Sequence, residues 1–228
     1  MAKSGGVLAK AVKALRAGKP LVLFDGEARE GEADIVLHAS FASPEKVAFA
    51  RKAGGLLCVA TDARTAKAFG LPFLNRFFKQ KGGETLKRVA YSRTAYGDEP
   101  AFSISFNHES VFTGITDGDR SLTLKRFAQV VASRDGEAFA REFRAPGHVQ
   151  LLVSRGLRAR RGHTELGVWL CELAGLAPAA VLCELLGGKG KALSRGEARA
   201  FAKKRGLVFV EGKAVMLYEA RGRCLWLE

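Results

Sequence analysis

Apolar and polar residues alternate along the chain with two different periods, one typical of strands and one typical of helices. Short uninterrupted apolar runs predict buried strands at residues 21–24, 35–37, 56–60 and 180–183, and the later runs 207–210 and 215–218 predict two closing strands. Phe102, Ile104 and Phe106 alternate with serines, which is typical of a half-buried strand. The pattern therefore supplies enough strand segments for a sheet.

Segments with helical periodicity separate these strands. They cover residues 4–18, 43–54 and 122–131, a stretch after His163-Thr164, and a last predicted helix at 194–206. Ser43-Pro44-Glu45 has the cap, the early proline and the early acid of a helix start, and Ser194 with Glu197 predicts a capping box. Residues 1–228 are therefore expected to form a single α/β (α+β) domain, with a mixed β-sheet layered with helices.

The composition is that of a globular protein with a full core. Of the 228 residues, 47% are hydrophobic and 26% are charged, and 37 Lys and Arg against 23 Asp and Glu give a net charge of +14. The positive charge suggests nucleic acid or a phosphorylated ligand as the partner. The four cysteines have no CxxC spacing, which argues against a structural zinc site. Because no signal peptide or membrane-length apolar run is present, we expect a cytoplasmic protein that does not contact a membrane.

An acidic segment stands out in this basic chain. Residues 25–34 contain five carboxylates and one arginine, directly after a predicted buried strand. One interpretation is a solvated acidic loop. However, ligand crevices of α/β proteins form where strands end, and clustered carboxylates repel one another unless a cation or a proton lies between them. The segment therefore suggests a site for a hard divalent metal ion.

A basic segment precedes the predicted helix that follows His163-Thr164. It reads Arg158-Ala159-Arg160-Arg161-Gly162, so arginines and a glycine meet the free N–H groups of a helix N-terminus. This arrangement predicts a phosphate cradle that includes the Thr164 hydroxyl. The alternative is an ordinary solvated turn with a structural histidine.

Other candidates are single residues with an unusual setting. His148 follows a predicted Pro146-Gly147 turn and can transfer protons near neutral pH. Glu184 ends an otherwise apolar strand, where an unpaired acid is costly. Cys58 lies among apolar residues and is by itself most simply a core residue. The segment 113–120 is interpreted either as a helix cap or as a ligand loop.

Seven short segments, several of them described above, follow one another along the chain. They are Arg29-Glu30, Glu32 and Asp34; Gly55-Leu56-Leu57-Cys58; Thr94-Ala95-Tyr96-Gly97; Thr113-Gly114-Ile115 with Asp119-Arg120; Pro146-Gly147-His148-Val149; Gly162-His163-Thr164-Glu165; and Leu182-Cys183-Glu184. The ordered set, spanning residues 15–210, resembles the 3,4-dihydroxy-2-butanone 4-phosphate synthase family of riboflavin biosynthesis. Nothing in the chain resembles the GTP cyclohydrolase domain sometimes fused to this family, so the monofunctional form is expected. Residues 98–100 are interpreted as a small loop insertion.

The resemblance implies a lyase that converts D-ribulose 5-phosphate to 3,4-dihydroxy-2-butanone 4-phosphate and formate, by metal-assisted enediolate formation, skeletal rearrangement and release of C4. It also implies a homodimer with active sites near the interface and Mg²⁺ or Mn²⁺, two ions per site. Its catalytic residues would be Asp34, Cys58, His148 and Glu184, and its metal ligands Glu30 and His163. The substrate would be bound by Arg29, Glu30, Glu32, Asp34, Thr113, Asp119, Arg160, Gly162, His163, Thr164 and Glu184.

Two alternatives oppose this reading. A basic protein that binds RNA or another polyanion would explain the net charge, but the aromatic residues are mostly phenylalanines in core-like positions, without a stacking motif on a basic strand. A family member that has lost its activity is opposed by the intact candidates Arg29, Glu30, Asp34, His148, His163 and Glu184. No nucleic-acid partner is therefore expected.

Overall fold

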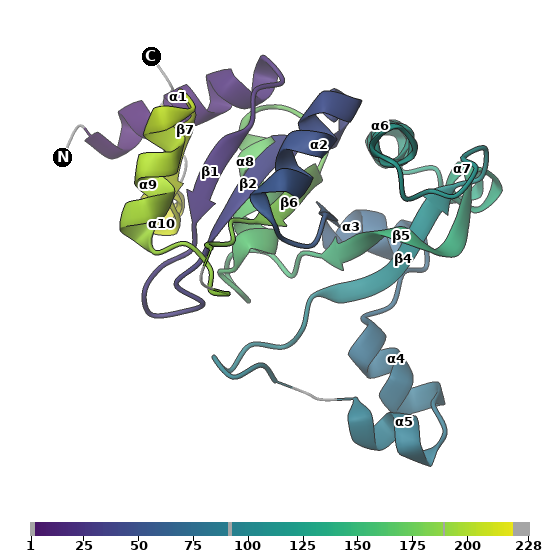
Figure 1. The fold of residues 1–228 in the computed structure, drawn as a ribbon. Helices are drawn as coiled ribbons and strands as arrows, with labels where there is room; N and C mark the ends of the chain where they lie inside the picture. Colours follow the sequence, from purple (N-terminus) through teal and green to yellow (C-terminus); the bar gives the residue numbers. More distant parts are fainter. Residues whose placement is uncertain (1–2, 91–92, 189, 221–228) are drawn as a thin grey trace.

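The computed structural model describes residues 3–90, 93–188 and 190–220, and its strands form one mixed seven-stranded sheet (Figure 1). The strands are β1 (Leu21–Phe24), β2 (Ala33–His38), β3 (Cys58–Thr61), β4 (Phe102–His108), β5 (Phe143–Val153), β6 (Ala179–Glu184) and β7 (Val208–Glu211). Their order in the sheet is β4-β5-β3-β6-β2-β1-β7, with β1–β7 and β3–β5 parallel and the other pairs antiparallel. The predicted fold class, α/β with a mixed sheet, is confirmed.

Helices cover both faces of this sheet. They are α1 (Lys3–Arg16), the 3₁₀ turn η1 (Ala39–Phe41), α2 (Pro44–Ala53), α3 (Ala63–Ala68), α4 (Leu74–Lys81), α5 (Glu84–Val89), α6 (Asp117–Ser133), α7 (Gly136–Glu142), α8 (His163–Leu173), α9 (Arg195–Lys204) and α10 (Gly212–Ala220). Buried residues of α2, α6, α7 and α9 share one hydrophobic cluster with one face of the sheet, and those of α1, α8 and α10 share a second cluster with the other face. The strands β1, β2, β3 and most of β6 are buried, as their short apolar runs predict.

Both predicted helix starts are confirmed, but the side chain of Ser43 makes no capping hydrogen bond, so the predicted capping chemistry is confirmed only at Ser194. Helix α2 begins at Pro44 directly after Ser43, and Ser194 of α9 accepts a hydrogen bond from the Glu197 N–H while the Glu197 side chain returns to the Ser194 N–H at 2.9 Å. Helix α6 is longer than residues 122–131, because Thr116 caps it and its first turn already begins at Asp117. The cap interpretation of the 113–120 segment is therefore confirmed for Thr116.

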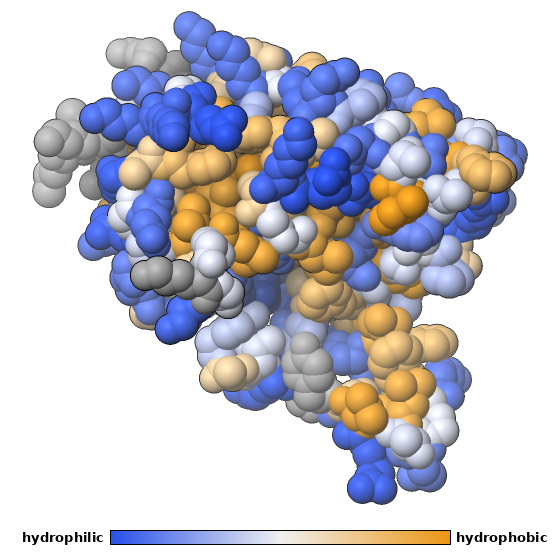
Figure 2. Space-filling model, viewed as in Figure 1, coloured by the Kyte–Doolittle hydropathy of each residue, from blue (hydrophilic) through white to orange (hydrophobic). Residues whose placement is uncertain are grey.

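The chain between β3 and β4 contains a helical hairpin that the sequence reading missed. Helices α4 and α5 extend away from the sheet in Figure 1 and lead back to the segment before β4. Figure 2 shows apolar residues gathered on this hairpin, where Phe77, Leu86 and Val89 are exposed. Leu74, Phe77 and Phe78 of α4 have the i, i+3, i+4 spacing of an amphipathic helix, so the signal was present in the sequence.

Three predictions of local structure are wrong. Residues 215–218 lie in helix α10 rather than in a strand, because Val215 and Tyr218, one helical turn apart, are buried while Leu217 between them is 43% exposed. An unbroken apolar run does not distinguish these two cases. Strand β3 begins at Cys58, so the predicted start at residue 56 is two residues early.

The third error is the separate turn at Pro146-Gly147, which lies within β5, whereas the strand predicted at 102–106 is confirmed as part of β4. The β4–β5 pair contains two irregularities. A register shift between Phe102 and Ser105 places Phe102 opposite Leu152, whereas Ile104 and Phe106 pack on the other face of the sheet. The pairing then jumps from Phe106–Val149 to Asn107–Arg144, so residues 145–148 bulge within β5 instead of forming a separate turn. The alternation at 102–106 is therefore interrupted by bulges that sequence periodicity does not reveal.

Two further expectations concern the membrane and the thiols. Among the residues that the structure describes, no helix is long and apolar enough to cross a bilayer. Cys58, Cys171 and Cys183 are buried free thiols, and Cys224 lies outside the described residues.

Candidate active site

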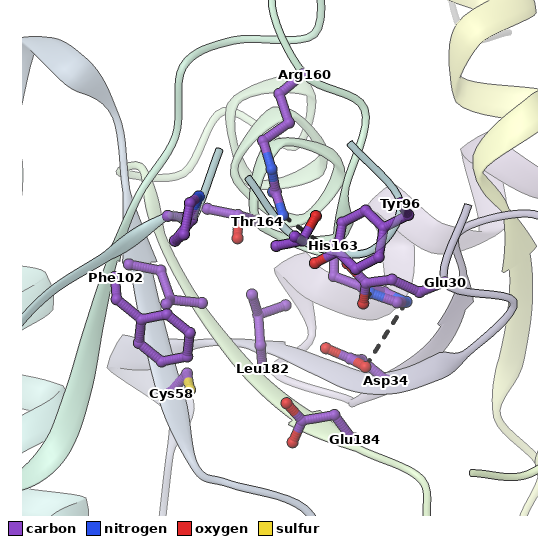
Figure 3. Close-up of a pocket in the computed structure, with 14 residues that line it drawn as sticks. Glu30, Asp34, Cys58, Tyr96, Phe102, Arg160, His163, Thr164, Leu182 and Glu184 are labelled. Carbon is purple, nitrogen blue, oxygen red and sulfur yellow. Dashed lines mark ion pairs between the residues drawn. The ribbon is translucent and has the colours of Figure 1, made fainter. Parts of the chain in front are cut away.

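A cavity of about 180 Å³ lies at the ends of strands β2 and β6, beside the start of helix α8 (Figure 3). Glu30, Asp34 and His163 lie on one side of it, and Cys58 and Phe102 lie on the other. Its full lining is Glu30, Asp34, Cys58, Thr94, Tyr96, Pro100, Ala101, Phe102, Leu152, Arg160, His163, Thr164, Leu182 and Glu184. Acidic, basic and apolar walls therefore meet in one small space.

Two carboxylates form the floor of this cavity. Asp34 and Glu184 are direct cross-strand partners on the antiparallel pair β2–β6, which places both side chains on one face of the sheet. Asp34 is 3% exposed, and burial, together with the nearby charge of Glu184, raises its pKa even though His163 acts in the opposite direction. Folding thus makes proton binding by Asp34 easier than in water.

Glu184 is held by the backbone before β3. The Leu56 N–H donates a hydrogen bond of 2.7 Å to Glu184 Oε2, and the Gly55 N–H donates one of 3.1 Å to the Glu184 carbonyl. A Cβ atom at Gly55 would lie 2.2 Å from Glu184 Oε2, so only glycine leaves room for the carboxylate. This explains why Gly55 and Glu184 belong to one site although they are far apart in the sequence.

His163, the first residue of α8, connects the acidic segment to this floor. Its Nε2 donates to the Glu32 carbonyl at 3.2 Å, and its ring nitrogens lie 3.6 Å from Glu30 Oε2 and 3.7 Å from Asp34 Oδ1. Burial opposes a positive charge on His163, but Asp34 and Glu30 outweigh that effect and raise the pKa of His163. For Glu30, burial is likewise outweighed by His163 and Arg29, which lower its pKa.

Asp25 organises the acidic loop from its buried start. Its Oδ1 accepts hydrogen bonds from the N–H groups of Gly26 and Glu32, and its Oδ2 accepts from the Glu30 N–H and from Arg29. The side chain of Asp25 is fully buried. The loop is therefore folded around one carboxylate, and this fold presents Glu30 and Asp34 to the cavity.

Two arginines meet behind the cavity wall with only glycine between them. A Cβ atom at Gly162 would lie 2.5 Å from a terminal nitrogen of Arg160 and 2.6 Å from one of Arg29. Asp98 accepts from Arg29 at 2.9 and 2.6 Å and lies 3.4 Å from Arg160 Nε. Glu165, fully buried, accepts from Arg160 at 2.6 Å and from the Gly162 N–H at 3.2 Å. These carboxylates fix the guanidinium of Arg160 at the edge of the cavity.

Only part of the predicted phosphate cradle faces this cavity. Arg160 and Thr164 line it, whereas Arg158 and Arg161 line a separate cleft of about 630 Å³ on the other side of Arg29 and Arg160. The arginines of this run therefore line two different spaces, because the turn before α8 points successive side chains in different directions.

Cys58 lines the cavity from the first position of β3. It is 3% exposed, and burial together with the charge of Glu184 raises the pKa of its thiol well above the ordinary value. The thiol is therefore protonated at neutral pH, which does not fit a nucleophile. Cys58 shapes the wall and lies near the carboxylates of Glu184 and Asp34.

A second group of predicted residues lies elsewhere. His148 and Thr113 are exposed and Asp119 is partly exposed, and none of the three lines the cavity. Asp119 accepts from the Gly114 N–H at 2.9 Å, and Asn107 contacts His148. The structure thus brings together Glu30, Asp34, Cys58, Arg160, His163, Thr164 and Glu184, with Arg29, Glu32 and Gly162 directly behind them, but places His148, Thr113 and Asp119 in a separate group.

Several residues of the site were not singled out by sequence reasoning. Asp25, Tyr96, Asp98 and Glu165 all belong to segments that the sequence marks, yet none was given a role. Asp98 lies in the segment interpreted as a loop insertion, and its carboxylate, like that of Glu30, contacts both arginines. Tyr96 stacks its ring under Arg29, with 4.8 Å from the guanidinium carbon to the ring centre. No sequence signal marks Asp98, because its partners Arg29 and Arg160 are distant along the chain.

The donor set of this site suits a hard divalent cation. Ligand atoms of Asp25, Glu30 and His163 all lie within 4.8 Å of one another. Asp34 Oδ1 is buried and has no hydrogen-bond partner among the described residues. Carboxylate oxygens with one imidazole nitrogen are ligands that Mg²⁺ and Mn²⁺ accept. Because the oxygens of Asp25 are already occupied by the loop's own N–H groups, Glu30 and His163 are the better ligands.

Comparison with known proteins bears on this site. A family model described as 3,4-dihydroxy-2-butanone 4-phosphate synthase matches residues 9–218. The synthase of this name from Archaeoglobus fulgidus is 40% identical over 217 residues, with 91% of each chain covered. The one from Methanosarcina mazei is 39% identical over 218 residues, covering 91% of this chain and 88% of the relative. A crystal structure of a 3,4-dihydroxy-2-butanone 4-phosphate synthase in complex with two magnesium ions matches with a TM-score of 0.73 at 30% identity, covering 93% of this chain and 97% of that one.

The fold and the site define an α/β protein with a buried carboxylate–histidine centre suited to a divalent cation. Within that class, the chain belongs to the 3,4-dihydroxy-2-butanone 4-phosphate synthase family. The resemblance inferred from the ordered sequence motifs is thereby confirmed.

Proposed function

We propose that this protein converts D-ribulose 5-phosphate to 3,4-dihydroxy-2-butanone 4-phosphate and formate, as a lyase of riboflavin biosynthesis. The observation that carries the proposal is the cavity in which Asp34, Glu184, Glu30 and His163 meet Arg160 (Figure 3). Acids able to remove a proton from a ketose line one part of it, and a guanidinium able to hold a phosphate lines another. Membership of the synthase family supports the same reaction.

The Asp34–Glu184 pair supplies the base that removes the C3 proton. These side chains are cross-strand neighbours, and burial together with the charge of Glu184 raises the pKa of Asp34 from 3.8 to about 7, which makes Asp34 a proton acceptor near neutral pH. The pair rests on strands rather than on loops, and the Leu56 N–H orients Glu184. Removal of the proton gives an enediolate, from which the C1 hydroxyl leaves before the skeleton rearranges and C4 is released as formate.

The substrate is held at both ends. Arg160 and Thr164, with the backbone at Gly162, bind the phosphate at the start of α8, where the N–H groups and the helix dipole favour an anion. Arg29 and Glu32 orient the sugar hydroxyls from the acidic loop. Because the rearrangement needs a fixed carbon skeleton, this orientation contributes directly to the rate.

Glu30 and His163 would hold a divalent cation, Mg²⁺ or Mn²⁺, and the magnesium-containing structure of a relative supports two ions per site. When bound, the cation supplies positive charge that offsets negative charge developing on the diol oxygens of the substrate. Glu30 and His163 serve the reaction by holding this charge beside the Asp34–Glu184 floor.

Two copies of the chain complete each site in this proposal. His148, Thr113 and Asp119 lie outside the cavity, and exposed apolar side chains flank both groups: Leu56, Phe102 and Leu186 near the cavity, and Phe112, Ile115 and Leu122 near Thr113 and Asp119. Phe112 is 94% exposed, which is unusual for so large an apolar side chain. A homodimer in which the His148 group of one subunit faces the cavity of the other would cover these residues and unite the predicted set.

The single-domain organisation and the cytoplasmic location remain predictions.

One incubation tests the proposed reaction. Purified protein is mixed with ribulose 5-phosphate and Mg²⁺, and formate is measured against a heat-denatured control. We expect formate from the native protein, its loss with EDTA, and its recovery when Mg²⁺ is restored. Absence of formate would refute the reaction, and formate unaffected by EDTA would refute the role of the cation.

A further inference from the structure

The side chain of Asn107, at the bulge between β4 and β5, holds the backbone and the ring of His148 together. Its Oδ1 accepts a hydrogen bond of 2.8 Å from the His148 N–H. Its Nδ2 lies 3.2 Å from His148 Nδ1 and 3.4 Å from the Thr113 carbonyl oxygen. Asn107 is 4% exposed, whereas the ring that it contacts belongs to an exposed residue. One buried amide thus contacts two of the three residues of the second group, His148 and Thr113.

The orientation of this amide is fixed by partners that each have only one hydrogen-bonding role. A backbone N–H can only donate, so the atom facing the His148 N–H is the amide oxygen. A carbonyl can only accept, so the atom facing the Thr113 carbonyl is the amide nitrogen. The group facing His148 Nδ1 is therefore an N–H donor, and Nδ1 must offer its lone pair. A neutral imidazole with its lone pair on Nδ1 carries its proton on Nε2.

Two glycines allow neighbouring segments to approach Asn107 closely. A Cβ atom at Gly114 would lie 2.1 Å from Asn107 Nδ2, and one at Gly147 would lie 2.4 Å from the Asn107 backbone nitrogen. Gly114 also has a φ of +88°, a conformation that other residues rarely adopt. Two segments, one at Gly114 and one at Gly147, therefore pack closely against Asn107.

We propose that Asn107 is a positioning residue that holds His148 as the neutral Nε2–H tautomer. His148 then presents a hydrogen-bond donor at Nε2, and it polarises a substrate oxygen in the way a neutral imidazole can, without transferring its proton. The proton-abstracting base consequently belongs to the Asp34–Glu184 pair and not to His148. The assignment of the substrate oxygen rests on the proposed function, whereas the tautomer rests only on the contacts of Asn107.

The ring nitrogens of histidine report their tautomer directly in nuclear magnetic resonance. The chain has 4 histidines, so the spectrum of protein labelled with ¹⁵N-histidine is simple. His38 is an internal reference, because its Nδ1 accepts from the Ser40 N–H at 3.3 Å and its Nε2 donates to the Ala177 carbonyl at 2.9 Å. At about pH 8, where free imidazole with its pKa of about 6.5 is neutral, we expect His148 to show the Nε2–H pattern that His38 shows. The opposite pattern at His148 would overturn the proposal.

Asn107→Asp is the variant that separates positioning from packing. The carboxylate has the shape of the amide but only accepts, so it should keep the His148 N–H bond and draw the ring proton to Nδ1. The signals of His148 should change to the Nδ1–H pattern while those of His38 stay in place. An unchanged tautomer at His148 would overturn the role of Asn107.

Activity is measured separately from the tautomer. In Asn107→Asp and Asn107→Leu we expect kcat to fall about tenfold or more, within the range for a lost donor in a transition state, with KM little changed. If Asn107→Asp changed the tautomer but kept the wild-type kcat, the donor role of His148 would be wrong. If wild-type protein released no formate, the proposed function would fail, and the spectra would still decide the tautomer.

Discussion

The backbone N–H of Leu56 donates a hydrogen bond of 2.7 Å to Oε2 of Glu184. The residue before Leu56 is Gly55, and a methyl group there would clash with the Glu184 carboxylate. A carboxylate at the end of β6 thus depends on the two residues that lead into β3. This relationship makes Gly55 a test of how far the floor of the cavity tolerates displacement.

Gly55→Ala should remove activity with a moderate loss of stability. The added Cβ would lie 2.2 Å from Glu184 Oε2 and 2.5 Å from the Glu184 backbone nitrogen, so the backbone itself must shift. We expect about 1–3 kcal/mol less free energy of unfolding, as for other overpacked sites, and a fall in kcat of at least about tenfold. Chemical denaturation and formate release measure the two effects. Gly83→Ala, where no atom lies within 4 Å of the added Cβ, is the control and should match the wild type.

Glu30→Gln should abolish the stabilisation of the fold by Mg²⁺. A ligand that binds only the folded state stabilises it by about 2.7 kcal/mol at a concentration one hundred times its Kd, so the melting temperature of the wild type should rise on titration with Mg²⁺. Glu27→Gln changes an exposed acid of the same loop that does not line the cavity and should behave like the wild type. An equal rise in the Glu30→Gln variant would show that the cation binds elsewhere.

Mixing two inactive variants should restore activity if each site is built from two subunits. His148→Ala and Glu184→Gln are each expected to be inactive as homodimers. After exchange of subunits, about half of the dimers are mixed and each contains one intact site, so the mixture should regain about a quarter of the wild-type activity. Formate release before and after exchange measures this. A mixture that stays inactive while the dimers exchange would place His148 and Glu184 in the same site of one chain.

Glu165→Gln should destabilise the start of α8 and weaken substrate binding. Glu165 is fully buried and accepts from Arg160 and from the backbone N–H groups of Arg155 and Gly162. Loss of its charge removes a charged partner from a buried guanidinium, which costs about 1.5–3 kcal/mol. We also expect a higher KM, because Arg160 is no longer fixed. Glu84→Gln is the control, since that side chain is 87% exposed and forms only a surface pair with Lys87.

The contribution of Glu99 to stability should disappear in acid. Glu99 accepts two hydrogen bonds from Arg76, at 2.7 and 2.6 Å, and these bonds, with Arg155 nearby, lower its pKa from 4.5 to about 2. A lowered pKa in the folded state means that the stabilisation is complete above pH 4.5 and is lost as the pH falls through about 2. Glu99→Gln should therefore be less stable than the wild type by up to about 1 kcal/mol at neutral pH, and the two denaturation curves should converge on acidification. A constant difference between them would contradict the ion pair.

The sequence predicted the strands well because four of them are short apolar runs buried on both faces. It singled out Glu184 because this acid ends an apolar run and Asp34 because it belongs to the acidic segment before one, and the structure brings both into the cavity. The metal ligands Glu30 and His163 followed from the family resemblance and stay predictions. It did not predict the bulge that turns Phe102 to the cavity, nor the helical state of residues 215–218, because both depend on what packs against them rather than on local period. Asn107 and Asp98 escaped notice for a related reason: their partners, His148 and Arg160, are distant in the sequence.

Asp98 connects the loop that carries Arg29 with the turn that carries Arg160. The guanidinium groups that could bind an anion are therefore already paired with carboxylates of the chain. A phosphate that binds beside Arg160 must replace Asp98 or Glu165 on the guanidinium, or share it with them. Its affinity is set by the difference between two ion pairs, so it is weaker than the number of arginines suggests, and a departing product leaves behind a guanidinium that still has a partner. In kinetic terms, the same contact that limits affinity favours turnover.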